Sequence, residues 1–138
     1  GDKGKNNGLT HAWLSGSLKI SGEEQLKFLI NMHNYNLGIT HAAIDSTMQN
    51  IYLGKLTDDG WDWYGKTGSG RRNISYKGKT ERVRDGWFVG YLQKSGQTYV
   101  VVTNLTDIKT PTGSEHDTSG GPQAKAITQD IIKQLQPK

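Results

Sequence analysis

The stretch that decides the fold is residues 63–70 (WYGKTGSG), which is followed at residues 85–91 by a second aromatic and glycine-rich run, DGWFVGY. Both runs combine aromatic residues with glycine, which is typical of strands that another backbone or a ligand approaches closely. Within the first run, Lys66 offers an ammonium, Thr67 a hydroxyl and Gly68 a strand surface clear of side-chain atoms. The triplet is therefore a candidate ligand-holding wall, and the alternative is an ordinary exposed hairpin strand.

Two helices are expected before this stretch. Ser21 followed by Glu24 has the spacing of a capping box, in which the two residues satisfy each other's backbone N–H groups. Apolar residues then recur at helical spacing, so we expect a helix over residues 22–34. A weaker apolar stripe predicts a second helix over residues 40–50.

The sequence then changes to short β-rich runs at residues 51–53, 61–67, 87–93 and 99–105. Only a few turn residues, including Gly96, separate the last two runs, so these should form an antiparallel hairpin. Residues 110–122 read as a loop. The order of helices, strands and a closing helix predicts an α+β fold with an antiparallel sheet flanked by helices.

The closing helix is expected from Gly121 onward. Its apolar residues share one helical face, which we expect to pack on the sheet. These residues are Ala124, Ile127, Ile131 and Leu135.

Composition narrows the function classes. The 138 residues are 33% hydrophobic, include no cysteine and carry a net charge of +4. Without cysteine there is neither a disulfide nor a thiolate metal site, and no apolar run approaches the roughly 18 residues of a membrane span. The four histidines lack a paired spacing, so no metal site is expected. Asp58, Asp59 and Asp62 are interpreted as a turn signal instead of a general-acid pair.

A group of basic residues follows the Lys-Thr-Gly run. We interpret it as a solvated connecting loop, and the alternative is a cluster that helps to attract an anionic substrate. The aromatic interleaving typical of nucleic-acid binders is missing, so no nucleic-acid partner is expected. The group comprises Arg71, Arg72, Lys77, Lys79, Arg82 and Arg84.

Four segments in order resemble one family. Residues 12–21 (AWLSGSLKIS), 64–70 and 86–91 and the helix from Gly121 onward are similar to the C-terminal half of class D β-lactamases and the related penicillin-sensing receptor domains. That family's nucleophile motif, Ser-x-x-Lys, and its Ser-x-Val and Tyr-Gly-Asn motifs lie upstream of the Trp13 segment and do not occur here. The resemblance implies that residues 1–138 are the C-terminal portion of a β-lactamase/transpeptidase-like domain, completed by a separate N-terminal polypeptide.

The resemblance also implies residue roles. Lys66, Thr67 and Gly68 would hold the substrate, and the backbone N–H of Ser69 would help form the oxyanion hole. Trp13 would donate a hydrogen bond to a lysine carbamate, made from carbon dioxide on the absent half, and no other cofactor is implied. The family's carboxylate-binding arginine is not evident, which leaves Lys125 as the candidate substitute.

The implied activity is hydrolysis of penicillin-type antibiotics by a serine enzyme, and hence antibiotic resistance, in the bacterial periplasm or outside the cell. A homodimer of the assembled enzyme is compatible with this interpretation. Two alternatives remain open. One is the sensor domain of a β-lactam receptor, which differs only in slow release of the acyl group, and the other is a non-catalytic remnant.

Overall fold

The computed structural model describes residues 19–56, 58, 60–112 and 119–135. Three helices and four strands follow one another along the chain, and the strands form a single antiparallel sheet in the order β1-β2-β3-β4. This confirms the expected α+β class. The elements are α1 (Gly22–His33), α2 (His41–Asn50), β1 (Tyr52–Lys55), β2 (Asp62–Tyr76), β3 (Lys79–Lys94), β4 (Gln97–Thr106) and α3 (Gly120–Leu135).

Side chains cap the first two helices. The Ser21 hydroxyl accepts a hydrogen bond from the Glu24 backbone N–H at 3.2 Å, and the Glu24 carboxylate accepts one from the Ser21 N–H at 2.8 Å. The predicted capping box is confirmed, and it fixes where α1 begins. Thr40 caps α2 in the same way, because its hydroxyl accepts from the Ala43 N–H at 3.3 Å.

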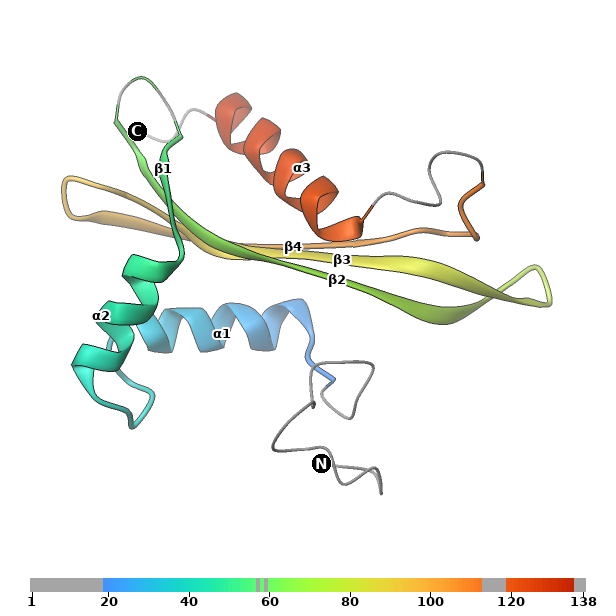
Figure 1. Cartoon of the computed structure of the whole chain (residues 1–138), viewed down its shortest axis with the longest axis horizontal. Coiled ribbons are helices and arrows are strands. Elements are labelled where there is room, and N and C mark those ends of the chain that lie inside the picture. Colours follow the sequence, from blue (N-terminus) through green and yellow to red (C-terminus); the bar gives the residue numbers. More distant parts are fainter. Residues whose placement is uncertain (1–18, 57, 59, 113–118, 136–138) are drawn as a thin grey trace.

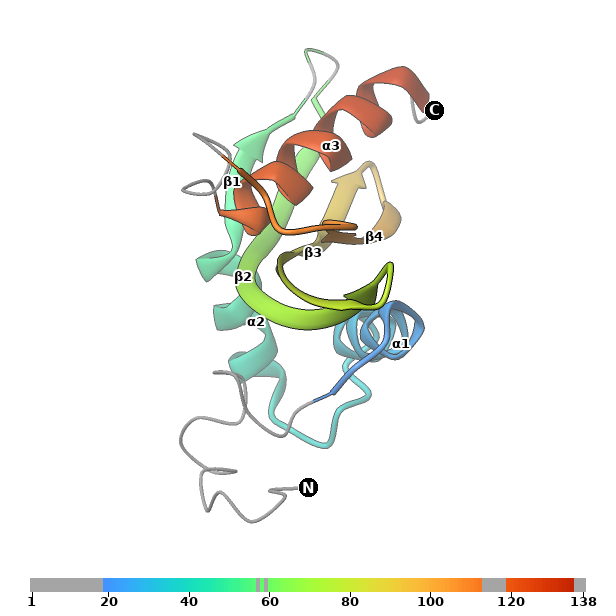
Figure 2. The ribbon, with the colours of Figure 1, turned by 90° about the vertical axis from the view of Figure 1, so that its right-hand side faces the viewer.

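The sheet separates two layers of helix. α3 lies against one face, and α1 and α2 lie on the other (Figures 1 and 2). Each face has its own apolar cluster. Trp61, Trp63, Phe88, Leu92, Ala124 and Ile132 are buried on the α3 side, and Leu29, Met32, Ile44 and Tyr91 on the α1 side. In the described part of the chain, no helix is long and apolar enough to cross a membrane.

The sequence predicted a loop between the Lys-Thr-Gly strand and the next strand, and this prediction is wrong. β2 and β3 pair without interruption from Asp62↔Gln93 to Tyr76↔Lys79, and only Lys77 and Gly78 form the turn. Both turn residues have positive φ, as a two-residue type I′ turn requires. The sequence concealed this long hairpin because its far end projects beyond the helices (Figure 1), so few side chains there need to be apolar.

One of the six basic residues that were assigned to this loop is buried. Arg84 is only 9% exposed, and its guanidinium makes two hydrogen bonds to the carboxylate of Asp107, at 2.8 and 3.0 Å. The Arg84 backbone N–H adds a third bond to the same carboxylate at 3.1 Å. The ion pair between Arg84 and Asp107 therefore holds β3 against the chain segment that follows β4.

The hairpin predicted for the last two strands is confirmed, with β3 paired to β4 from Asp85↔Thr106 to Lys94↔Gln97. The predicted inner face of α3 is partly wrong. Ala124 is buried, but Ile127, Ile131 and Leu135 are 41%, 48% and 73% exposed. The buried stripe instead runs through Gly120, Gly121, Ala124, Thr128 and Ile132. Thr128 can lie inside because its hydroxyl donates to the Ala124 carbonyl at 2.7 Å.

Candidate ligand-binding edge of β2

The Lys-Thr-Gly triplet lies where β2 loses its outer neighbour. β1 pairs with β2 only between Lys55↔Asp62 and Tyr52↔Tyr64. One further bond, from the Gly65 N–H to the Ile51 carbonyl at 2.7 Å, ends the contact. Among the described residues, no strand pairs with this side of β2 from Lys66 onward, so the triplet lies on an exposed sheet edge.

The direction of the backbone groups at this edge follows from that last bond. In an antiparallel ladder, successive residues direct their N–H and C=O groups alternately toward and away from the same neighbour. The Gly65 N–H points away from β3, and the β2–β3 register has no bulge. The N–H groups of Thr67 and Ser69 therefore also point to the free edge, as the sequence interpretation of the Ser69 amide requires.

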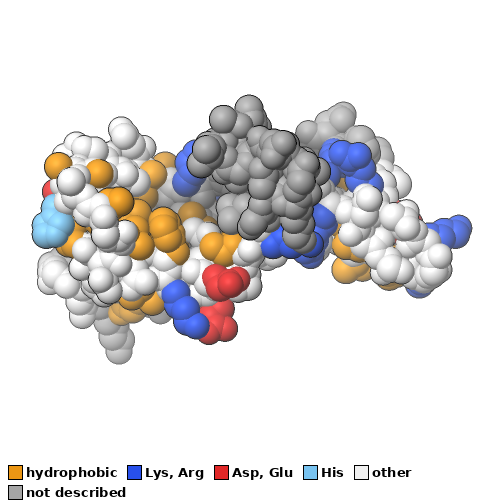
Figure 3. Space-filling view, turned by 90° about the horizontal axis from the view of Figure 1, so that it is seen from below, with side chains coloured by type: hydrophobic (Ala, Val, Ile, Leu, Met, Phe, Trp, Pro, Cys, Tyr) orange, Lys and Arg blue, Asp and Glu red, His pale blue; other side chains and the backbone are white. Residues whose placement is uncertain are grey.

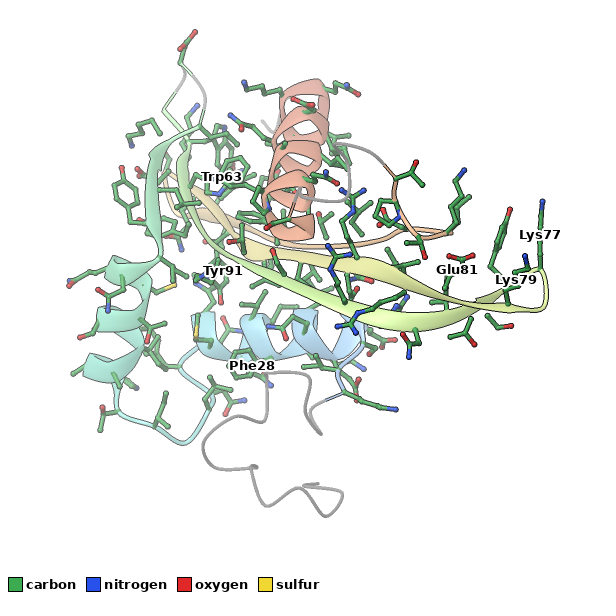
Figure 4. All side chains as sticks on the ribbon, turned by 45° about the vertical axis from the view of Figure 1, so that its right-hand side comes forward. Phe28, Trp63, Lys77, Lys79, Glu81 and Tyr91 are labelled. Carbon is green, nitrogen blue, oxygen red and sulfur yellow. The ribbon has the colours of Figure 1, made fainter. Side chains whose placement is uncertain are left out.

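The side chains alternate between the two faces of the sheet. Lys66 is paired with Val89, which packs in the cluster around Tyr91 on the α1 side, and Thr67 is paired with Phe88 on the α3 side. Figure 4 marks these faces with Tyr91 and Trp63. Gly65 makes the arrangement possible, because a Cβ there would lie 2.3 Å from the Phe88 ring.

The Lys66 ammonium lies at the free edge. Its Nζ donates a hydrogen bond to the carbonyl of Thr67 at 2.8 Å, and that carbonyl points outward with its own N–H. Lys66 is exposed, whereas Thr67 is half-buried. An ammonium, a hydroxyl and outward-facing N–H groups therefore meet within four consecutive residues.

The N-terminal end of α3 lies beside the same edge of β2. The Ser69 hydroxyl accepts a hydrogen bond from the backbone N–H of Gly121 at 3.0 Å. Lys125 follows one helical turn later and is half-buried. No sequence pattern signalled the contact between Ser69 and Gly121, because it joins residues far apart in the chain. Trp13 lies outside the described residues.

The acidic residues before the triplet are engaged elsewhere. The Asp62 carboxylate accepts from Lys55 Nζ at 2.8 Å and from the Tyr52 hydroxyl at 2.9 Å. These bonds, that from Lys55 first, lower the pKa of Asp62. Burial raises the pKa of the nearby Tyr64 hydroxyl, and the charge of Asp62 adds to the effect. Asp62 is thus an ionised structural partner of β1, which is incompatible with a general-acid role at neutral pH.

Charge on the α1 face is distributed unevenly. Figure 3 shows hydrophobic side chains gathered toward the α2 end, and Lys and Arg side chains toward the middle and the far hairpin. Among the described residues, no three His, Asp or Glu side chains come together to hold a metal ion. The edge is suited to holding a carboxylate and donating to an oxygen that gains negative charge.

The chain belongs to the family described as the penicillin-binding protein transpeptidase domain, whose sequence model matches residues 1–133. Within that family it is similar to class D β-lactamases. It is 47% identical to β-lactamase OXA-1 of Escherichia coli over 77% of this chain and 36% of that protein. It is 37% identical to β-lactamase OXA-9 of Klebsiella pneumoniae over 98% of this chain and 46% of that protein.

A third relative is not named as a β-lactamase. The methicillin resistance mecR1 protein of Staphylococcus aureus is 30% identical over 94% of this chain and 19% of its own length. Among solved structures, the class D β-lactamase OXA-427 superposes with a TM-score of 0.76 at 29% identity, covering 99% of this chain and 53% of that one. The chain thus spans about half, or less, of the proteins it matches, which agrees with the predicted correspondence to part of a class D-like fold.

Proposed function

We propose that this chain is the substrate-holding part of a class D-like serine β-lactamase, which opens the lactam amide of penicillin-type antibiotics through an acyl-enzyme. The observation that carries the proposal is the free edge of β2, where the Lys66 ammonium and the outward Ser69 N–H lie together. Similarity to two class D β-lactamases along most of this chain supports it.

In the proposed reaction, a serine outside residues 1–138 gives up its proton to a general base and attacks the lactam carbonyl carbon. The carbonyl oxygen gains negative charge, which the Ser69 N–H stabilises by donating a hydrogen bond. The carbon–nitrogen bond then breaks, the ring opens, and the ring nitrogen takes up the proton that the serine gave to the base. Water hydrolyses the resulting ester, which frees the serine and releases the opened antibiotic.

Lys66 and Thr67 bind instead of reacting. The substrate carboxylate would take the Lys66 ammonium that now donates to the Thr67 carbonyl, with the Thr67 hydroxyl as a second donor. Gly68 leaves the edge clear for the ligand backbone. Lys125, on the same side of the sheet as Thr67, would supply additional positive charge for the carboxylate, with less directional bonding than an arginine.

The nucleophile and the general base lie outside residues 1–138. A carbamate formed from carbon dioxide on the lysine of a Ser-x-x-Lys segment would supply the general base, and Trp13 would hold that carbamate. The expected setting is the periplasm or the exterior of a bacterium. A dimer of the assembled enzyme is compatible with this proposal.

A second candidate is a β-lactam sensor, which the similarity to the mecR1 protein favours. A sensor would use the same edge to form the acyl-enzyme and would release the acyl group slowly. The rate of deacylation distinguishes the two candidates.

The test uses the protein purified with whatever accompanies it. Mass spectrometry should find a Ser-x-x-Lys segment, either on the same polypeptide or on a second one, and benzylpenicillin should add its mass there. Repeated turnover of nitrocefin would support the enzyme, and a single lasting adduct would support the sensor. If no adduct forms on any polypeptide in the sample, both candidates fail.

A further inference from the structure

The start of α3 contacts the sheet backbone to backbone. A Cβ on Gly86 would lie 2.2 Å from the Gly120 carbonyl carbon, and a Cβ on Gly121 would lie 2.7 Å from the Gly68 carbonyl oxygen. Gly86, Gly120 and Gly121 have no positive φ, so glycine is required at these three positions by space alone. Glycine here lets a helix end approach the candidate ligand-holding edge more closely than any other residue would allow.

One side chain joins the two surfaces at this point. The Gly121 N–H belongs to the first turn of α3, where N–H groups have no acceptor within the helix. The Ser69 hydroxyl provides that acceptor at 3.0 Å, from 52 residues earlier in the chain. The bond is partly buried, which shields it from competition with water.

The same residue presents the outward N–H group. Ser69 is attached to α3 through its side chain, and its amide faces the free edge of β2. Because the hydroxyl and the amide nitrogen are separated by only two carbon atoms, the bond to Gly121 restrains the rotation of the peptide that carries the N–H. Lys125, one turn further along α3, is held at a fixed offset by the same contact.

We propose that the Ser69 hydroxyl is a positioning residue: by bonding the Gly121 N–H, it holds the Ser69 amide in the orientation that an oxyanion needs. This inference rests on the proposed function. A donor of this kind acts only when it lies about 2.7–3.1 Å from the developing charge, and small misplacements in an active site lower rates steeply. The hydroxyl thus acts on turnover more than on substrate binding.

The experiment compares Ser69→Ala, which removes the hydroxyl, with Ser69→Thr, which keeps it. Ser75→Ala is the matched control, because Ser75 lies further along β2, on the exposed far hairpin. Three quantities are measured in the same protein: kcat and KM for nitrocefin, and the hydrogen-exchange rate of the Gly121 amide by NMR.

We expect Ser69→Ala to lower kcat about 10-fold, with KM changed less than about 2-fold, and to speed exchange at Gly121. Ser69→Thr should keep most of the wild-type kcat and most of the slow exchange at Gly121. Ser75→Ala should match the wild type in both respects. An unchanged kcat in Ser69→Ala, with an active wild type, overturns the inference and leaves the proposed function intact. A wild type that never reacts with nitrocefin refutes the proposed function. It then also refutes the positioning role, which depends on that function.

Discussion

Lys66 and Thr67 are neighbours in β2, yet their side chains leave the sheet on opposite faces, Lys66 beside Val89 and Thr67 beside Phe88. They meet again only at the free edge, where the Lys66 ammonium donates to the Thr67 carbonyl at 2.8 Å. A ligand on this edge can therefore be held from both faces at once. This property depends on β1 ending its pairing beside Gly65.

Removing the ammonium should weaken acylation. We expect Lys66→Ala to lower kcat/KM for benzylpenicillin about 100-fold, since an interaction with a charged ligand group is lost. Lys66→Arg should retain part of the activity, because the charge remains. Lys79→Ala is the control, as Lys79 lies near the end of the far hairpin (Figure 4). Equal losses in the Lys66 and Lys79 variants would mean that only net charge matters.

The glycine contacts under α3 should be sensitive to one added methyl group. Gly86→Ala would place its Cβ 2.2 Å from Gly120, so α3 must move, and we expect a loss of about 1–3 kcal/mol in the free energy of unfolding. Gly70→Ala is the matched control on β2, where the Cβ would be 3.9 Å from the Asp85 carbonyl oxygen. Denaturant unfolding measures both. A Gly86 variant as stable as the Gly70 variant contradicts the close contact.

Tyr91 ties the sheet to α1. Its hydroxyl is buried and donates to the Leu29 carbonyl at 2.8 Å, so Tyr91→Phe should cost about 1–2 kcal/mol. The control is Tyr99→Phe, since Tyr99 is 45% exposed. Chemical denaturation at neutral pH tests this prediction, which fails if the two variants are equally stable.

The same tyrosine should make stability depend on alkaline pH. Burial raises the pKa of Tyr91 from 10.0 to about 12, which means that the folded state favours the neutral phenol. Its contribution is complete below pH 10 and is lost as the pH rises through the folded-state value. The wild type should therefore lose more stability than Tyr91→Phe between pH 10 and 12. Parallel curves for the two proteins would refute this assignment.

The ionised carboxylate of Asp107 should stabilise the fold at neutral pH and lose this contribution at acid pH. The hydrogen bond from Arg84 lowers its pKa below the ordinary 3.8, so its contribution is present above that value and disappears as the pH falls through the folded-state pKa. Asp107→Asn removes a carboxylate that accepts three hydrogen bonds from Arg84 and should cost about 1–3 kcal/mol at pH 7. The difference in stability between the variant and the wild type should narrow as the pH is lowered through the folded-state pKa, as thermal unfolding in a series of buffers from pH 7 downward would show. A constant difference would exclude the ionised pair as its cause.

The elements with local signals could be predicted. The Ser21 and Glu24 spacing located α1, and the short turn around Gly96 located the β3–β4 hairpin. The Lys-Thr-Gly triplet was correctly expected in a strand, while the roles assigned to its residues and to the Ser69 amide stay predictions. These features depend on residues close together in the sequence, where propensity and hydrogen bonding are readable.

The missed features depend on distant contacts. Near the turn of the β2–β3 hairpin, at residues 71–82, most side chains are exposed, so the sequence there lacks an apolar period and its basic residues resembled a loop. The buried stripe of α3 is set by close glycine packing and by the bonds of the Thr128 hydroxyl, not by the most apolar residues. The bond between Ser69 and Gly121 crosses 52 residues and leaves no pattern in either segment.

The most direct measurement of the central claim is the NMR signal of the Ser69 amide in the assembled, ¹⁵N-labelled protein before and after acylation by benzylpenicillin. If the free edge of β2 holds the lactam carbonyl, the Ser69 N–H signal shifts strongly and its hydrogen exchange slows, while the Ser75 amide is unchanged. If the acyl adduct forms and the Ser69 amide keeps its free-state shift and exchange rate, the edge of β2 is not the wall of the active site.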